Sequence, residues 1–210
     1  MDARYIVIEG PIGVGKTSLA HLLATELNAR LFLEKVEDNP FLARFYQDRH
    51  QFAFQTQIFF LLSRYRQLGF LQQQDLFSSV MLSDYFLPKD RIFAALNLNP
   101  EELSLYDQIY TLLNPRIPKP DLVIYLQAET NALMQRIKLR GRDYEKGMEW
   151  DYLASLNQAY NDFFFYYKDT PLLVIQTTEI DFVKSRADLE DLLDKITQMK
   201  KGTQYYVPRI

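Results

Sequence analysis

The sequence contains no cysteine in its 210 residues. This absence excludes disulfides, thiolate catalysis and metal sites built on cysteine ligands. The sequence also lacks a surplus of positive charge: it has 24 Lys and Arg against 27 Asp and Glu, a net charge of −3. We therefore expect no nucleic-acid partner. The apolar runs are too short to span a bilayer. The chain begins with Met1, a charged residue and a strand-like run, which is not the pattern of a signal peptide. A cytoplasmic protein without a membrane partner is therefore expected.

Internal repeats, long low-complexity tracts and interdomain linkers are also missing. A chain of this length is enough for one sizeable α/β domain and short for two. We therefore predict a single domain over residues 1–210.

The clearest motif is GPIGVGKTS at Gly10–Ser18, which fits GxxxxGK(S/T) at every fixed position. An apolar run typical of a buried strand precedes it, and leucines at helical spacing follow. Its glycines let backbone N–H groups converge on phosphate oxygens, Lys16 adds a positive charge, and the Thr17 hydroxyl is left for Mg²⁺. The motif therefore predicts a phosphate loop that binds a nucleoside triphosphate through Gly10, Pro11, Ile12, Gly13, Val14, Gly15, Lys16, Thr17 and Ser18.

Two further strand-like runs each end in a carboxylate. Residues 31–33 lead into Glu34, and residues 80–83 lead into Asp84. Open α/β sheets bind ligands at the carboxyl ends of their strands, so we expect both acids to face the γ-phosphate. Either acid alone could equally cap a strand or neutralise a surface lysine.

An arginine-rich segment follows later in the chain. Arg136 and Arg140 are one helical turn apart, and Arg142 comes directly after the helix ends at a glycine. Three like charges at one helix end are costly unless an anion lies among them. We interpret residues 136–147 as a lid that clamps phosphate, and the alternative is a solvated basic turn paired with neighbouring acids.

The order of helical and strand-like segments predicts an α/β fold of the P-loop kinase type, with a parallel five-stranded sheet flanked by helices. One long amphipathic helix, residues 52–71, places Gln57 and Arg64 on the same face. The tail KGTQYYVPRI is interpreted as a loosely ordered end. The expected strands are 6–8, 31–33, 80–83, 121–127 and 172–175.

Several classes of phosphate-loop protein compete for this pattern. A GTP-switch protein needs DxxG and NKxD motifs, and neither occurs here. A motor-type ATPase would need paired acids at the end of a central strand. The expected strands do not end in such a pair, which makes this class a weak candidate. A nucleoside monophosphate kinase, or another small-molecule P-loop kinase, is the second candidate, but it should offer more arginines to an acceptor phosphate. A nucleotide-gated binding protein without activity is disfavoured by Glu34, which is placed to deprotonate a hydroxyl.

Five segments together resemble the deoxynucleoside kinase family, and most of all its bacterial purine-specific members. The resemblance implies ATP-dependent phosphorylation of the 5′-hydroxyl of a deoxynucleoside, with deoxyguanosine or deoxyadenosine as the expected substrate in nucleotide salvage. It also implies a homodimer. The segments are GPIGVGKTS, EKVEDNPFLARFY, QIFFLLSRYRQ, DY with KDRIFA, and RIKLRGRDYEK.

The resemblance implies roles for the residues that would contact the deoxynucleoside. Glu34 matches the general base that accepts the proton of the 5′-hydroxyl. Tyr46 and Glu145 match the pair that holds the 3′-hydroxyl, and Gln57 matches the glutamine that hydrogen-bonds the base. Two companions of Gln57 are expected beside the base, Arg64 and Asp90.

On the donor side, the resemblance implies that Lys16 and the lid arginines stabilise the transferring group. Asp84 matches an acid that helps to hold Mg²⁺, together with the Thr17 hydroxyl. The loop at Asp181 and Phe182 matches one that packs on the adenine of ATP. The lid arginines in this comparison are Arg136, Arg140 and Arg142.

The sequence departs from the family pattern directly after Asp84. Tyr85 stands where most members have an arginine near the 5′-hydroxyl, and Phe86 replaces a serine. Tyrosine at this place resembles the deoxyguanosine kinase subgroup, which favours a purine substrate. Two explanations stay open: Lys89 supplies the missing charge, or the substrate is held differently.

Overall fold

The computed structural model describes residues 5–73, 80–113 and 118–207, and within them one parallel sheet forms the centre of the molecule. The sheet has six strands in the order β2-β3-β1-β4-β5-β6, and every neighbouring pair is parallel. This confirms the predicted α/β fold with a parallel sheet flanked by helices. The strands are β1 Tyr5–Glu9, β2 Arg30–Phe32, β3 Met81–Ser83, β4 Leu122–Gln127, β5 Leu172–Gln176 and β6 Thr203–Tyr206.

The predicted number of five strands was wrong, because residues 203–206 of the tail, expected to be loosely ordered, form a sixth strand. Strand β6 pairs with β5 in the register Leu172↔Thr203 to Ile175↔Tyr206. Gly202, at φ 71, turns the chain into the strand. β6 lies at the edge of the sheet and is largely exposed, so it lacks the apolar run by which buried strands are recognised.

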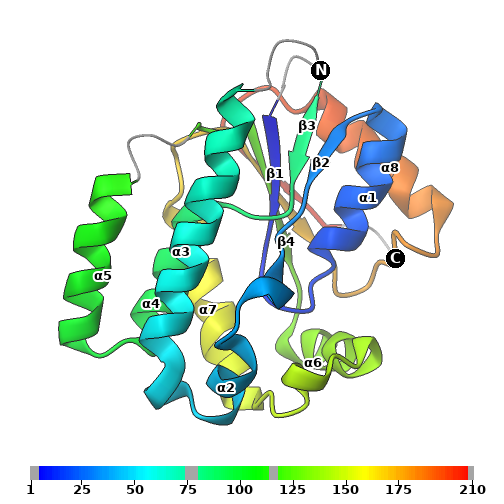
Figure 1. Cartoon of the computed structure of the whole chain (residues 1–210). Coiled ribbons are helices and arrows are strands. Elements are labelled where there is room, and N and C mark those ends of the chain that lie inside the picture. The colour runs from blue at the N-terminus through cyan, green and yellow to red at the C-terminus, as the bar shows by residue number, and fades with distance from the viewer. Residues whose placement is uncertain (1–4, 74–79, 114–117, 208–210) are drawn as a thin grey trace.

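Helices cover both faces of the sheet (Figure 1). Helices α3, α4, α5 and α7 lie on one face, and α1 and α8 lie on the other. The helices are α1 Lys16–Leu27, α2 Leu42–Gln47, α3 Arg49–Gln73, α4 Asp90–Asn97, α5 Pro100–Leu113, α6 Thr130–Arg140, α7 Trp150–Tyr166 and α8 Arg186–Gln198. Three short 3-10 segments add to them, η1 Val36–Asp38, η2 Leu87–Lys89 and η4 Asp143–Glu145.

Alternating side chains of the strands divide the interior into two apolar cores. Val7 and Val123 point into the core beneath α3, α4, α5 and α7, whereas Ile6 and Ile124 point into the core beneath α1 and α8. This alternation follows from the two-residue period of a strand. Both faces of β1 are therefore buried, which fixes the position of the phosphate loop at its carboxyl end.

The glycines of the phosphate loop are required by close backbone contacts. A Cβ atom at Gly10 would lie 2.5 Å from the carbonyl oxygen of Leu126, and one at Gly13 would lie 2.9 Å from that of Leu133. Gly13 also adopts a φ of +86, which favours glycine. The loop is thus pressed against β4 and α6, so its backbone N–H groups have a fixed direction. Among the described residues, no helix combines the length and apolar character needed to cross a bilayer.

Candidate active site

A cavity of about 420 Å³ opens beside the phosphate loop, at the carboxyl ends of β1 and β3. The loop forms one wall, the segments after β2 and β3 form the floor, and α2, α3 and the lid form the other walls. Most of the predicted site residues meet here. Those that line the cavity are Ile12, Gly13, Gly15, Lys16, Thr17, Ser18, Glu34, Tyr46, Gln57, Arg64, Asp84, Arg140, Arg142 and Glu145.

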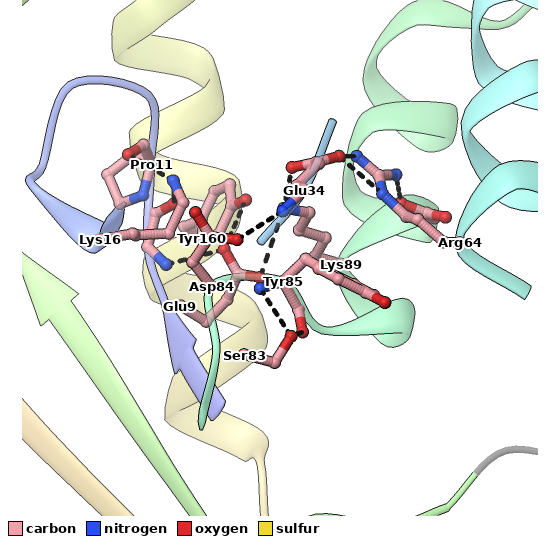
Figure 2. Close-up of polar contacts among 12 residues, drawn as sticks. Glu9, Pro11, Lys16, Glu34, Arg64, Ser83, Asp84, Tyr85, Lys89 and Tyr160 are labelled. Carbon is pink, nitrogen blue, oxygen red and sulfur yellow. Dashed lines mark hydrogen bonds and ion pairs between the residues drawn. The ribbon is translucent and has the colours of Figure 1, made fainter. Parts of the chain in front are cut away.

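Lys16 is folded back on its own loop. Its Nζ donates to the carbonyl oxygens of Gly10 at 2.7 Å and Pro11 at 3.2 Å (Figure 2). Burial lowers the pKa of Lys16 to about 8, although the charges of Glu9, Glu34 and Asp84 oppose this shift. A triphosphate bound to the loop would supply the negative charge that restores a fully protonated lysine.

Asp84 joins the loop to the backbone of Glu34, which carries the second carboxylate of the site. Its Oδ2 accepts a hydrogen bond of 2.6 Å from the Thr17 hydroxyl, and its Oδ1 accepts one of 2.7 Å from the backbone N–H of Glu34. Glu34 and Asp84 therefore lie close together beside the loop, and their position facing a γ-phosphate stays a prediction. A hydroxyl and a carboxylate oxygen side by side are hard oxygen ligands of the kind that Mg²⁺ takes beside phosphates and water. Thr17 and Asp84 fit such an ion.

Glu34 lies between two cations (Figure 2). Its Oε1 accepts from Arg64, with the Nε donor at 2.8 Å, and its Oε2 accepts from Lys89 Nζ at 3.1 Å. Burial by itself would raise the pKa of Glu34, but the charges and hydrogen bonds of Arg64 and Lys89 outweigh it and lower the pKa to about 2. Glu34 is therefore ionised at neutral pH, as a proton acceptor must be.

Helix α3 carries the side chains that were expected to read the base. Gln57, Leu61 and Arg64 are all buried, at 3%, 0% and 5% exposure, which confirms that they share the inner face of this helix. The Arg64 guanidinium also pairs with Asp90 at the start of α4. Asp90 does not line the cavity itself and reaches it through Arg64.

The lid is held by carboxylates. Arg140 donates to both oxygens of Glu145, at 2.6 and 2.8 Å, and Arg142 pairs with Glu37 of η1 at 3.3 Å. The ring of Tyr144 stacks on that of Tyr46, with 6.0 Å between centroids. The crowding of arginines is thus relieved by acids of the chain, while Arg140 and Arg142 still line the cavity.

Seven predicted residues lie outside the cavity lining: Asp90, the loop residues Gly10, Pro11 and Val14, and the three described next, Arg136, Asp181 and Phe182. Arg136 donates to the carbonyl oxygen of Thr177 at 2.5 Å, beyond the end of β5. Phe182 is buried, and its ring would lie 3.2 Å from a Cβ atom at Gly15. Asp181 accepts from the backbone N–H groups of its own turn. The roles of these three residues in binding or catalysis stay predictions.

Tyr85 and Phe86 belong to the apolar core beneath α3 and α7. Tyr85 is 1% exposed and does not line the cavity, and Phe86 packs edge to face on Tyr167 with 5.7 Å between centroids. Of the two explanations left open by the sequence, the structure favours a charge supplied by Lys89, since Lys89 lines the cavity and contacts Glu34.

Two contributors to the site were missed in the sequence. Glu9 ends β1 and is fully buried, and Tyr160 of α7 donates to it at 3.2 Å while lining the cavity. An acid at the end of an otherwise apolar strand, directly before a phosphate loop, is the signal that could have indicated Glu9. Tyr160 carries no comparable signal, because it stands in an aromatic-rich helix.

The fold and this cavity define a P-loop phosphotransferase: a phosphate loop, an ionised carboxylate and two arginines, Arg140 and Arg142, surround one space. Comparison with known proteins gives the family. A family profile described as "Deoxynucleoside kinase" matches residues 6–201. The chain belongs to the deoxynucleoside kinase family, and the predicted family and enzyme class are confirmed.

Individual relatives cover nearly the whole chain. The deoxyguanosine kinase of Bacillus subtilis is 37% identical over 206 residues, covering 94% of this chain and 98% of that protein. The deoxyguanosine kinase of Lactobacillus acidophilus is 33% identical over 210 residues, covering 93% and 90%. A structure of deoxyadenosine kinase from M. mycoides with bound dCTP has a TM-score of 0.80 at 27% identity, covering 93% of this chain and 100% of that one.

Proposed function

We propose that this kinase transfers the γ-phosphoryl group of ATP, with Mg²⁺, to the 5′-hydroxyl of a purine deoxynucleoside. Deoxyguanosine or deoxyadenosine would be the substrate, and the 5′-monophosphate would enter nucleotide salvage. The observation that carries the proposal is that Lys16, Glu34 and Gln57 line one cavity. The names of the relatives from Bacillus subtilis and Lactobacillus acidophilus support the purine preference.

The chemistry needs mainly positioning and charge. Glu34 accepts the proton of the 5′-hydroxyl while the 5′-oxygen of the deoxynucleoside attacks the γ-phosphorus of ATP. The attack is in line with the leaving group, ADP. Lys16, Arg140 and Arg142 stabilise the charge spread over the transferring oxygens. The Thr17 hydroxyl and the Asp84 carboxylate would hold Mg²⁺, which would supply positive charge against the phosphates.

The acceptor is held from the opposite wall. Gln57 offers an amide with both a donor and an acceptor, which suits hydrogen bonding to the edge of a purine. Tyr46 and Glu145 both line the cavity and would hold the 3′-hydroxyl. Arg64, which pairs with Asp90, lines the same cavity as Gln57 and would be its companion beside the base.

A radiometric screen should show phosphorylation of deoxyguanosine or deoxyadenosine in preference to the pyrimidine deoxynucleosides. ATP with Mg²⁺ is the donor, and the acceptors are the four deoxynucleosides, their 5′-monophosphates and adenosine. The deoxynucleosides are favoured because the cavity offers a carboxylate, Glu34, to a 5′-hydroxyl. Activity confined to the monophosphates would instead establish a nucleoside monophosphate kinase.

Replacing Gln57 by Ala should lower kcat/KM for the preferred deoxynucleoside about tenfold or more, since a buried hydrogen-bond partner of the base is lost. The affinity for ATP should stay within about twofold, because Gln57 lies on the wall facing the phosphate loop. Steady-state kinetics and ATP titration measure the two effects. Gln51→Ala, at an exposed position of the same helix, is the matched control. Equal losses of kcat/KM for the deoxynucleoside and of affinity for ATP would contradict the assignment of Gln57 to the base.

A homodimer and a cytoplasmic location complete the proposal. Exposed leucines on α3 and α5, Leu62, Leu105 and Leu112, support a contact between copies on this side of the molecule. Light scattering on the purified protein, giving one or two times the mass of the chain, tests the dimer.

A further inference from the structure

A row of five buried charged side chains runs from the end of β1 to the start of α4. Their signs alternate, and no side chain in the row is more than 11% exposed. Glu34 has a role in the proposed reaction, and Arg64 and Asp90 lie on the base side. The two others are unassigned by that reaction. In order, this buried charge row is Glu9, Lys89, Glu34, Arg64 and Asp90.

Lys89 bridges two carboxylates, one at the end of β1 and one beyond the end of β2. Its Nζ lies 3.1 Å from Oε2 of Glu34, beyond β2, and 3.5 Å from Oε2 of Glu9, at the end of β1. The Lys89 side chain is only 3% exposed. A buried ammonium is costly unless it is paired, so these two acids are what keeps Lys89 at this place.

Glu9 is in turn fixed from the other side. Its Oε1 accepts from the backbone N–H of Gly10 at 2.8 Å and from the Tyr160 hydroxyl at 3.2 Å. The Tyr160 ring is 1% exposed and stacks with Tyr125. One oxygen of Glu9 is therefore tied to the phosphate loop and α7, and the other is turned toward Lys89 (Figure 2).

We propose that Lys89 is the positioning residue for Glu34, and that Glu9 holds Lys89 in place for this task. The inference rests on the proposed function, in which Glu34 accepts the proton of the 5′-hydroxyl. Lys89 would fix one oxygen of Glu34, so that the remaining lone pairs face the acceptor. Through Glu9 and Gly10, the same contacts connect Glu34, the proposed general base, to the phosphate loop that would hold ATP.

The second cation on Glu34 cannot replace Lys89 in this role. Arg64 contacts the other oxygen, Oε1, and also pairs with Asp90 at the start of α4. When a nucleobase contacts Arg64, that guanidinium has a third partner to satisfy. Lys89 comes from the short segment η2 and has only carboxylate partners in the row. Its contact with Glu34 would therefore be independent of the base that is bound.

Four variants test the inference: Lys89→Met, Lys89→Arg, Glu9→Gln, and Lys89→Met combined with Glu9→Gln. We expect Lys89→Met to lower kcat at least tenfold, since a small misplacement of a reacting group costs this much or more. KM for ATP should change less than about twofold. Lys89→Arg should recover most of the lost kcat, because it restores a cation to the two carboxylates.

Glu9→Gln should lower kcat less than Lys89→Met does, since the ammonium can remain on Glu34. In the double variant, the Glu9 substitution should cause no further loss and should raise the melting temperature above that of Lys89→Met. The reason is that Glu9 acts through Lys89 and is a buried unpaired charge without it. If Lys89→Met does not fold, the double variant and Lys89→Arg carry the test.

Arg91→Met, which removes an exposed cation from the same stretch of chain, is the control and should retain wild-type kcat. Wild-type kcat for Lys89→Met, or losses that multiply in the double variant, would overturn the inference. Failure of the proposed function is separately visible: wild-type enzyme would then leave deoxynucleosides unphosphorylated, or Glu34→Gln would remain active. If kcat falls in Glu34→Gln but not in Lys89→Met, the proposed function stands and only the role of Lys89 is refuted.

Discussion

Replacing Glu34 by Gln should lower kcat by a factor of about 10² or more, the usual scale for the loss of a general base. The glutamine has the same shape, but its amide cannot accept the proton of a hydroxyl. Because Arg64 and Lys89 lower the pKa of Glu34 to about 2, the wild-type carboxylate is ionised throughout the neutral range. The measurement is the steady-state rate with the preferred deoxynucleoside, alongside ATP titration, which should change little.

Asp38→Asn is the matched control for this substitution. Asp38 belongs to η1, four residues after Glu34, and its side chain is exposed. The same loss of one carboxylate should there leave kcat within about twofold of wild type. A Glu34→Gln enzyme with an unchanged rate would contradict the assignment of the base and leave Glu34 as a partner of Arg64 and Lys89 only.

The fold could be predicted where the sequence pattern is local and strong. Buried parallel strands are continuous apolar runs, so β1, β4 and β5 were visible, and the phosphate loop is defined by residues next to one another. Strand β6 could not be found in this way. It is an exposed edge strand whose pairing with β5 depends on the path of α8 and the turn at Gly202.

The site was predictable for a different reason: strand ends of a parallel sheet meet at one edge, so Glu34 and Asp84 had to approach the loop. Helical spacing likewise brought Gln57 and Arg64 to one face of α3. Contacts between distant segments were not predictable. The bond from Tyr160 to Glu9 joins residues 151 positions apart, and the contact of Arg136 with Thr177 joins residues 41 apart.

Replacing Lys16 by Met should lower kcat/KM by a factor of about 10² to 10³, the effect of removing one donor to developing charge. The ammonium follows the last glycine of the loop, where the N-terminus of α1 also favours an anion. Loss of its charge should weaken ATP binding as well as the chemical step. Kinetics and ATP titration with the purified variant measure both, and Lys168→Met, at an exposed position, is the control.

The pH dependence of ATP binding separates the charge of Lys16 from its bulk. Burial lowers the pKa of Lys16 to about 8 in the free protein, so above pH 8 a growing share of the protein must take up a proton when the triphosphate binds. The affinity of the wild-type enzyme should therefore fall by up to about tenfold per pH unit above pH 8. Lys16→Met should lack this dependence. A variant that binds ATP weakly but keeps the wild-type pH dependence would assign the titration to another group.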